Sequence, residues 1–245
     1  MKQQNGNLIL LGGAKGSGKG LTSSYLVELG YQEFSFASRL KKLISELYGF
    51  DYNKLLGLTP EDRIWREQLN DLSSAPRHSF IWSFDSVAWS LSFVHPPWSL
   101  LNNSSDYLPS LSNSFSRVDL INFVLARIKC TLFYKDLSPR SLMQIIGTDI
   151  FRFLSEDIWC TALYSDICDK LDTKIVISDG RFKNEALWAK NLGFKIIFID
   201  RNLQLLDSHS SEYLQDFKSL ADFVISNNGS PAQLKMSLLT TLNYV

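Results

Sequence analysis

The sequence of 245 residues lacks an excess of charge of either sign, since 25 lysines and arginines balance 25 aspartates and glutamates. A protein that binds a nucleic-acid polymer needs a basic surface, so the equal numbers of acidic and basic residues argue against such a partner. There is also no apolar run of the ~20 residues that a membrane-spanning helix needs, and no signal-peptide pattern near the start. We therefore expect a cytoplasmic protein with no membrane or nucleic-acid partner.

Cysteine and histidine are also scarce, with three of each. Cys130, Cys160 and Cys168 form no C-x-x-C pair, so we expect buried free thiols in a reducing compartment. The histidines are scattered along the chain, which argues against a histidine metal cluster. The length suits one α/β domain with an insertion.

A glycine-rich segment, residues 13–20, reads GAKGSGKG and directly follows an apolar Leu-Ile-Leu-Leu run. A segment of this kind between a strand and a helix is typical of a phosphate-binding loop. Gly13, Gly16 and Gly18 allow the backbone to curl so that several N–H groups converge on one phosphate. Lys19 reaches the β- and γ-phosphates, and the following helix presents its positive dipole end.

The loop departs from the usual pattern at Gly20, where a Ser or Thr normally ligates Mg²⁺. The next hydroxyl belongs to Thr22. Asp179 is a second candidate, because it directly follows an apolar strand and a carboxylate there can bind Mg²⁺ directly or through water. Water alone is a third option, and capping of the next helix is the alternative role for Asp179.

Apolar runs alternate with helical patterns on both sides of a less regular middle section, which indicates an α/β protein with a parallel sheet wound on both faces. In such sheets the ligand lies beyond the carboxyl ends of the strands. We expect strands at 8–12, 34–36, 174–178, 195–199 and 222–225. We expect helices at 21–29, 38–48, 139–153 (broken at Gly147), 156–171, 184–192 and 231–242.

The section from residue 57 to residue 135 is rich in Ser, Asn, Pro and Trp and shows no dominant periodic pattern. We interpret it as an inserted, mostly helical or irregular region that packs over the nucleotide face of a single domain spanning residues 1–245.

Transfer of a phosphoryl group requires two anions to be held in line while their charge is neutralised. Lys15 lies within the loop, Lys41 on the second helix, and Arg140 at the start of a later helix. Arg181 and Arg201 follow strand ends, which face the site. For each of these side chains, a solvated surface charge is the alternative.

Three segments resemble the deoxynucleoside monophosphate kinases of tailed bacteriophages. The first is PRSLMQIIGTD at residues 139–149, followed by Trp159; the second is DGRFKNE at 179–185; the third is DSHSSE at 207–212 together with NNGS at 227–230. The resemblance covers residues 7–50 and 136–245. The NNGS tail is also found in dephospho-coenzyme A kinase, so it marks a broader group of kinases.

The resemblance implies a P-loop NTP hydrolase-like fold and an enzyme that transfers the γ-phosphoryl group of ATP to a deoxynucleoside 5′-monophosphate. The products would be ADP and a deoxynucleoside diphosphate for phage DNA synthesis in the host cytoplasm, with ATP and Mg²⁺ bound. No general base is required, because the attacking phosphate oxygen is already anionic. The resemblance also places His209 and Glu212 in a lid over the phosphates.

Together, the motif, the strand ends and the resemblance single out four groups of residues. The catalytic group is Lys19, Arg140, Asp179 and Arg181. The ATP-binding group is Gly13, Lys15, Gly16, Ser17, Gly18, Lys19, Gly20, Arg201 and Asn228. The acceptor-binding group is Lys41, Arg140, Gln144, Gly147, Thr148, Trp159, Asp179, Arg181 and Glu212. The metal-binding group is Asp179 and Thr22.

Several alternatives stay open. Trp159 suits base stacking but also a core position, Gln144 suits a base edge but also the surface, and residues 207–211 suit a polar loop without function. Another small-molecule kinase, related to dephospho-coenzyme A kinase, shares the loop and the tail. A nucleotide-binding module without catalysis is the third hypothesis, motivated by Gly20. A homodimer and the range of accepted bases are left open.

Overall fold

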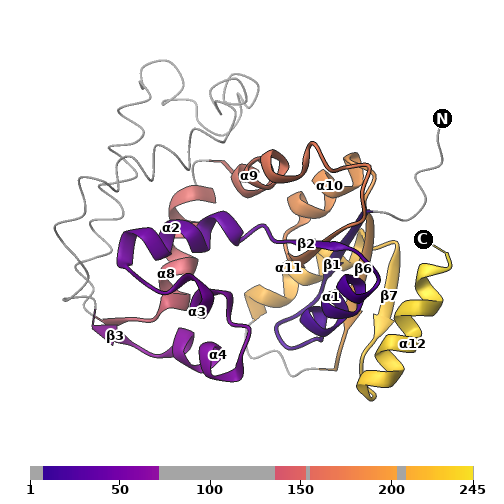
Figure 1. Ribbon diagram of the computed structural model, residues 1–245, viewed down its shortest axis with the longest axis horizontal. Helices are drawn as coiled ribbons and strands as arrows, with labels where there is room; N and C mark the ends of the chain where they lie inside the picture. Colours follow the sequence, from indigo (N-terminus) through magenta and orange to yellow (C-terminus); the bar gives the residue numbers. More distant parts are fainter. Residues whose placement is uncertain (1–7, 72–135, 153–154, 203–207, 245) are drawn as a thin grey trace. The chain divides into compact units, whose positions relative to one another are not determined.

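The computed structural model describes residues 8–71, 136–152, 155–202 and 208–244 (Figure 1). The chain divides into two compact units. The first unit combines Met1–Phe36 with Asp166–Val245, and the second is Ala37–Ser165. Most of the expected insert at 57–135 lies outside the described residues, so its boundaries stay a prediction.

The first unit is built on a five-stranded sheet in which every pairing is parallel. The central strand β1 is apolar apart from its final glycine and buried at every position, as expected of a strand that is covered on both faces. The order across the sheet is β2-β5-β1-β6-β7. The strands are β1 (Leu8–Gly12), β2 (Gln32–Phe34), β5 (Ile175–Gly180), β6 (Lys195–Asp200) and β7 (Phe223–Ser226).

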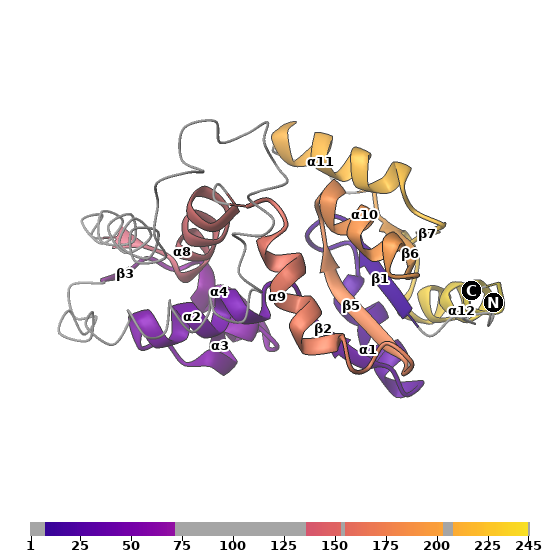
Figure 2. The same cartoon turned by 90° about the horizontal axis from the view of Figure 1, so that it is seen from above.

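Helices cover both faces of this sheet (Figure 2). On one face α1 packs against α12, and on the other α10 packs against α11. These helices are α1 (Lys19–Glu28), α10 (Lys183–Asn191), α11 (Ser208–Ser219) and α12 (Pro231–Leu242). The architecture confirms the predicted α/β P-loop-like fold, and it brings the carboxyl ends of all five strands to one edge.

An irregularity in the β1–β5 ladder changes the course of β5 just before its end. Leu10 pairs with Ile177 and Gly12 pairs with Gly180, so two steps along β1 match three steps along β5. An extra residue of this kind bends a strand and redirects a side chain. Asp179 lies in this bulge. The strand was expected to end at Ser178; it continues to Gly180 and includes Asp179.

Two glycines at the ends of β1 and β5 make room for the ring of Phe217, which is completely buried. A Cβ atom on Gly12 would overlap this ring, and one on Gly180 would lie 2.9 Å from its Cζ atom. The ring therefore inserts from α11 between the ends of the two strands. This contact packs α11 against the sheet.

The second unit is mainly helical, and α3, α4 and α8 each begin at a capping side chain. Thr59 accepts from the backbone N–H of Asp62, and Ser138 accepts from that of Ser141. Its elements are α2 (Ser38–Tyr48), α3 (Tyr52–Leu56), α4 (Pro60–Glu67), an antiparallel pair β3 (Asn70–Asp71) and β4 (Asp136–Leu137), α8 (Pro139–Gln144), a π-helix η3 (Ile145–Arg152) and most of α9 (Ile158–Ile167), whose last two residues belong to the first unit.

Three expectations are corrected by the backbone. Residues 208–211 form the start of helix α11 rather than a polar loop. The helix at 139–153 does not break at Gly147; it widens into a π-helix from Ile145. Strand β2 ends at Phe34 instead of beginning there, because it pairs with Ile175–Ile177.

The cysteine prediction is half right. Cys160 and Cys168 are free thiols, but Cys168 is exposed, and Cys130 lies outside the described residues. Within the described ranges, none of the helices combines the length and the apolar character needed to cross a bilayer.

The Phe217 contact predicts that Gly12→Ala destabilises the protein by about 1–3 kcal/mol, because the new methyl group overpacks the ring. Phe217→Leu in the same chain should recover part of this loss. The free energy of unfolding of the wild type, both single variants and the double variant, from denaturant titration, measures the coupling. Strictly additive losses would contradict the contact.

Candidate active site

The segment after β1 forms a tight loop that leads directly into α1. Gly13, Gly16 and Gly18 all have positive φ, at 142°, 80° and 107°. A Cβ on Gly13 would lie 2.5 Å from the carbonyl oxygen of Ile199, so only glycine fits there. Helix α1 begins at Lys19, and its free N–H groups at this end can bind an anion.

Lys19 folds back across the loop that precedes it. Its Nζ donates to the carbonyl oxygens of Gly13 at 2.6 Å and Ala14 at 2.8 Å. Burial, followed by the positive charge of Arg181, lowers the pKa of Lys19 from 10.5 to about 8, while Asp179 acts in the opposite direction. A phosphate in the loop would supply the negative charge that this ammonium group lacks.

Asn227 holds the loop from the far end of the chain. Its buried amide donates to the carbonyl oxygen of Ser17 at 2.7 Å, and a Cβ on Gly18 would collide with the same amide nitrogen. Sequence reasoning chose the neighbouring Asn228 for this region and missed Asn227. The available signal was the Asn-Asn pair directly after a strand that ends at this edge of the sheet.

Asp179 is held in a fixed orientation by the turn that follows β2. Its two carboxylate oxygens accept from the hydroxyl of Ser35 at 2.7 Å and from the backbone N–H of Phe36 at 2.8 Å. Capping of α10, the alternative role, falls to another carboxylate. Glu185, which is buried, accepts from the backbone N–H groups of Arg181 and Phe182 at 2.8 and 3.0 Å.

Glu185 therefore fixes the turn that carries the exposed side chain of Arg181. Sequence reasoning noted this glutamate only as part of a motif. A carboxylate three residues into a helix is a recognisable capping signal.

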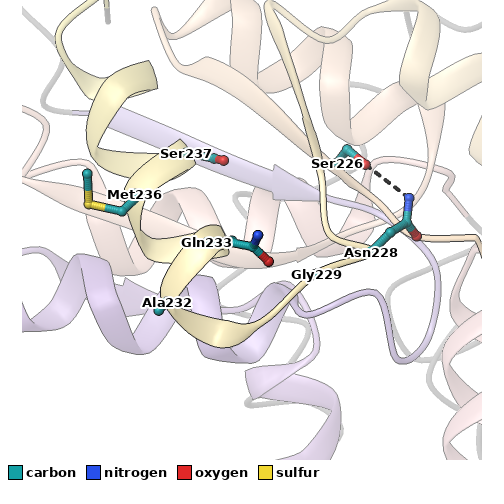
Figure 3. Close-up of a pocket in the computed structure, with 7 residues that line it drawn as sticks. All are labelled: Ser226, Asn228, Gly229, Ala232, Gln233, Met236 and Ser237. Atoms are coloured by element: carbon teal, nitrogen blue, oxygen red, sulfur yellow. Dashed lines mark hydrogen bonds between the residues drawn. The ribbon is translucent and has the colours of Figure 1, made fainter.

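Arg201 and Asn228 extend the site along the ends of β6 and β7. The Arg201 guanidinium donates to the carbonyl oxygen of Gly16 at 3.2 Å, and the Asn228 side-chain oxygen accepts from the backbone of Asn202 at 2.8 Å. Figure 3 shows Asn228 beside Gly229 at the edge of an open pocket of about 530 Å³ between β7 and α12. Ser226 and Gln233 line the same pocket.

The residues near the loop fit a Mg²⁺ ion that takes most of its ligands from phosphate and water. Thr22 is completely buried and donates its hydroxyl hydrogen to the Gly18 carbonyl at 3.0 Å, so it is turned away from the loop surface. Asp179 is half-buried and fixed. Among the described residues, no group of three or more His, Cys, Asp or Glu could form an all-protein cage, and Mg²⁺ does not require one.

The second unit contains the other predicted acceptor residues. Arg140 forms a 3.0 Å ion pair with Glu67, with a quarter of its side chain exposed. Gln144 and Thr148 are exposed, and Lys41 is half-buried on α2. Gly147 is buried, and its carbonyl oxygen accepts from the indole N–H of Trp159 at 3.0 Å. The backbone of Glu212 lies in α11, but its side chain is outside the described part of the structure.

Comparison with known proteins shows the family. A family model described as deoxynucleotide monophosphate kinase matches residues 98–238, more than half of the chain. The chain belongs to the deoxynucleotide monophosphate kinase family. A protein of Acanthamoeba polyphaga mimivirus named "Putative deoxynucleotide monophosphate kinase" is 29% identical over 241 residues, which cover 90% of this chain and 88% of the relative.

Membership of the deoxynucleotide monophosphate kinase family confirms the kinase family that the sequence motifs indicated and makes the chain a kinase, a phosphotransferase that acts on nucleotides. The family match includes η3, β5 and β7 but begins after the glycine-rich loop. The family match therefore says nothing of phosphate binding by the loop, and only the geometry of the loop supports that role.

The lowered pKa of Lys19 predicts a specific pH dependence of stability. Between about pH 8 and pH 10.5 the unfolded chain binds a proton at this lysine that the native state has released. The free energy of unfolding therefore rises with pH in this window relative to Lys19→Met, and below about pH 8 the difference between the two proteins is constant.

Denaturant titrations at about pH 7 and pH 10 measure this difference. Lys15→Met, which removes an exposed lysine from the same loop, is the matched control. Equal differences between wild type and Lys19→Met at the two pH values would contradict the burial effect.

Proposed function

We propose that this kinase transfers the γ-phosphoryl group of ATP to the 5′-phosphate of a deoxynucleoside monophosphate. The observation that carries the proposal is the geometry of Lys19, a half-buried ammonium group held against the inner carbonyls of a curled glycine loop. Arg181 and Asp179 are the charged side chains that act on this ammonium group. A cation in such a place needs an anion, and a nucleotide phosphate fits the loop.

Each residue of the first unit has a defined role in this proposal. Backbone N–H groups of Gly13–Lys19 bind the phosphates of ATP, and Lys19 exchanges its bonds to the loop carbonyls for the β- and γ-phosphates. Arg201 braces the loop through Gly16, and Asn228 contributes from the pocket beside it. Arg181 neutralises charge on the transferring group. No residue is required as a base, because the acceptor phosphate is already anionic.

Mg²⁺ would be held by Asp179 and by ATP phosphates, with Thr22 contributing only if its hydroxyl leaves Gly18. When bound, the ion would neutralise charge on the phosphates. The fixed carboxylate of Asp179 supports this assignment, because a ligand already oriented by Ser35 and Phe36 costs little ordering entropy on binding.

Four predicted acceptor residues of the second unit have the following roles in this proposal. Arg140 and Lys41 bind the acceptor phosphate, and Gln144 and Thr148 contact the base or sugar. The exposure of Gln144 and Thr148 supports their role, since groups that meet a substrate must be reachable. The resemblance to phage enzymes adds Glu212 and a role in viral DNA synthesis in the host cytoplasm.

The first test measures ADP release from Mg-ATP with dGMP, dTMP, dCMP, dAMP and their ribonucleotide counterparts. We expect turnover with one or more deoxynucleotides, and Lys19→Ala should lower it by several orders of magnitude while the protein remains folded, as checked by circular dichroism. An active Lys19→Ala enzyme would refute the role of the loop.

Other outcomes separate the alternatives. Turnover with dephospho-coenzyme A but with none of the nucleotides would identify a different small-molecule kinase. ATP binding without any acceptor-dependent ADP release would identify a binding module that lacks catalysis.

Gly20 offers a second test, because a Cβ atom there would meet nothing within 4 Å and the residue lies in the first turn of α1. Gly20→Ser would restore the hydroxyl that usually ligates Mg²⁺ at this position. We expect the Mg²⁺ concentration that half-saturates ATP binding to fall severalfold, as measured by calorimetric titration. Gly20→Ala, which adds the same backbone restriction without a hydroxyl, should leave it unchanged; an equal fall in both variants would exclude ligation by the serine.

A further inference from the structure

In the π-helix η3 of the second unit, two exposed residues lie between two buried pairs. Ile146 and Gly147 are buried, Thr148 and Asp149 are exposed, and Ile150 and Phe151 are buried again. A π-helix bonds i to i+5 and is less stable than an α-helix, so it persists only where other contacts stabilise it. Such widened turns often occur at functional sites.

Gly147 makes two contacts that hold this turn. Its carbonyl oxygen accepts from the indole N–H of Trp159 on α9, a bond that is buried between the two helices. Its Cα faces α2 closely enough that an added Cβ would lie 2.5 Å from the Cδ2 atom of Leu40. A side-chain donor at a backbone carbonyl competes with the regular helical ladder and favours a local change in winding.

The indole ring of Trp159 is not available as a stacking surface. Only 6% of the residue is exposed, and its ring packs against that of Phe151 with centroids 5.4 Å apart and planes tilted by 43°. A platform for a base must leave one face of the ring open. What Trp159 offers to the site is its N–H group, and that group is directed at Gly147.

We propose that Trp159 is a positioning residue: its N–H bond to Gly147 maintains the π-turn that presents Thr148 to the acceptor nucleotide. The same glycine keeps η3 against α2, next to Lys41, through Leu40. This inference rests on the proposed function for the identity of the acceptor. When this bond is lost, the segment returns towards α-helical winding, and the widened turn then contains one residue fewer. The side chains that follow this turn rotate about the helix axis by about 100° as a result.

Trp159→Phe tests the bond, because phenylalanine keeps an aromatic ring but has no N–H group. Amide hydrogen exchange is measured on residues 145–152 without nucleotide, and KM is measured for the acceptor and for ATP. We expect faster exchange in this segment and an acceptor KM raised between about tenfold and a hundredfold, with the KM for ATP unchanged. Trp65→Phe, at a tryptophan of the same unit that packs edge-on against Phe50, should change neither quantity.

Each other result overturns the inference. Unchanged exchange would show that the bond does not hold the turn. A raised acceptor KM without faster exchange would assign Trp159 to the base itself. Faster exchange with an unchanged acceptor KM would show that the bond stabilises the turn but does not position Thr148 for the acceptor. If the wild type uses no deoxynucleotide, the proposed function fails, and the exchange measurement still decides whether Trp159 holds the turn.

A second pair of variants covers the case in which Trp159→Phe does not fold. Gly147→Ala should raise the acceptor KM by pushing η3 away from Leu40, and Leu40→Val in the same chain should return it towards the wild-type value. Failure of the second change to rescue the first would contradict the positioning role of Gly147.

Discussion

The first unit depends on the absence of side chains around the carboxyl end of β1. A side chain on Gly12 would overlap the ring of Phe217, and one on Gly13 would overlap the backbone of Ile199. A side chain on Gly18 would overlap the amide of Asn227. Each of these contacts joins a different part of the chain to the loop. The loop is therefore shaped by the packing of its neighbours as much as by the freedom of its own glycines, and the geometry of the proposed anion site follows from that packing.

Electrostatics builds on this arrangement. The close packing leaves Lys19 little access to water, so its ammonium group depends on two loop carbonyls and on the balance between Arg181 and Asp179. Asp179 and Arg181 are both set by the end of β5, one through its bulge and the other through the buried carboxylate of Glu185. A single strand end thus orients both charges that act on the lysine.

Much of this was predictable from sequence, and the reasons for success and failure are physical. The buried strands and helix α12 were predicted within one or two residues, because continuous apolar runs and a Ser-Pro start are strong local signals. Helix α11 was missed because its first turn is rich in serine, which favours turns when taken alone. The roles of the loop and of Asp179 stay predictions, but the loop was predicted from its place after a strand and Asp179 from its place at the end of an apolar run. Asn227 and the π-turn were not predicted, since Asn227 bonds to a residue 210 positions away and no residue pattern specifies the π-winding. Glu185 was overlooked although its capping partners are only three and four residues away, a signal that the sequence does carry.

The bond between Asn227 and Ser17 joins residues that are 210 positions apart. A ribosome adds about 5–20 residues per second, so the loop waits roughly 10–40 seconds for the amide that completes it. During that interval the glycine-rich segment of the nascent chain lacks the Asn227 bond that holds it. The loop is therefore synthesised well before the side chain that completes its geometry.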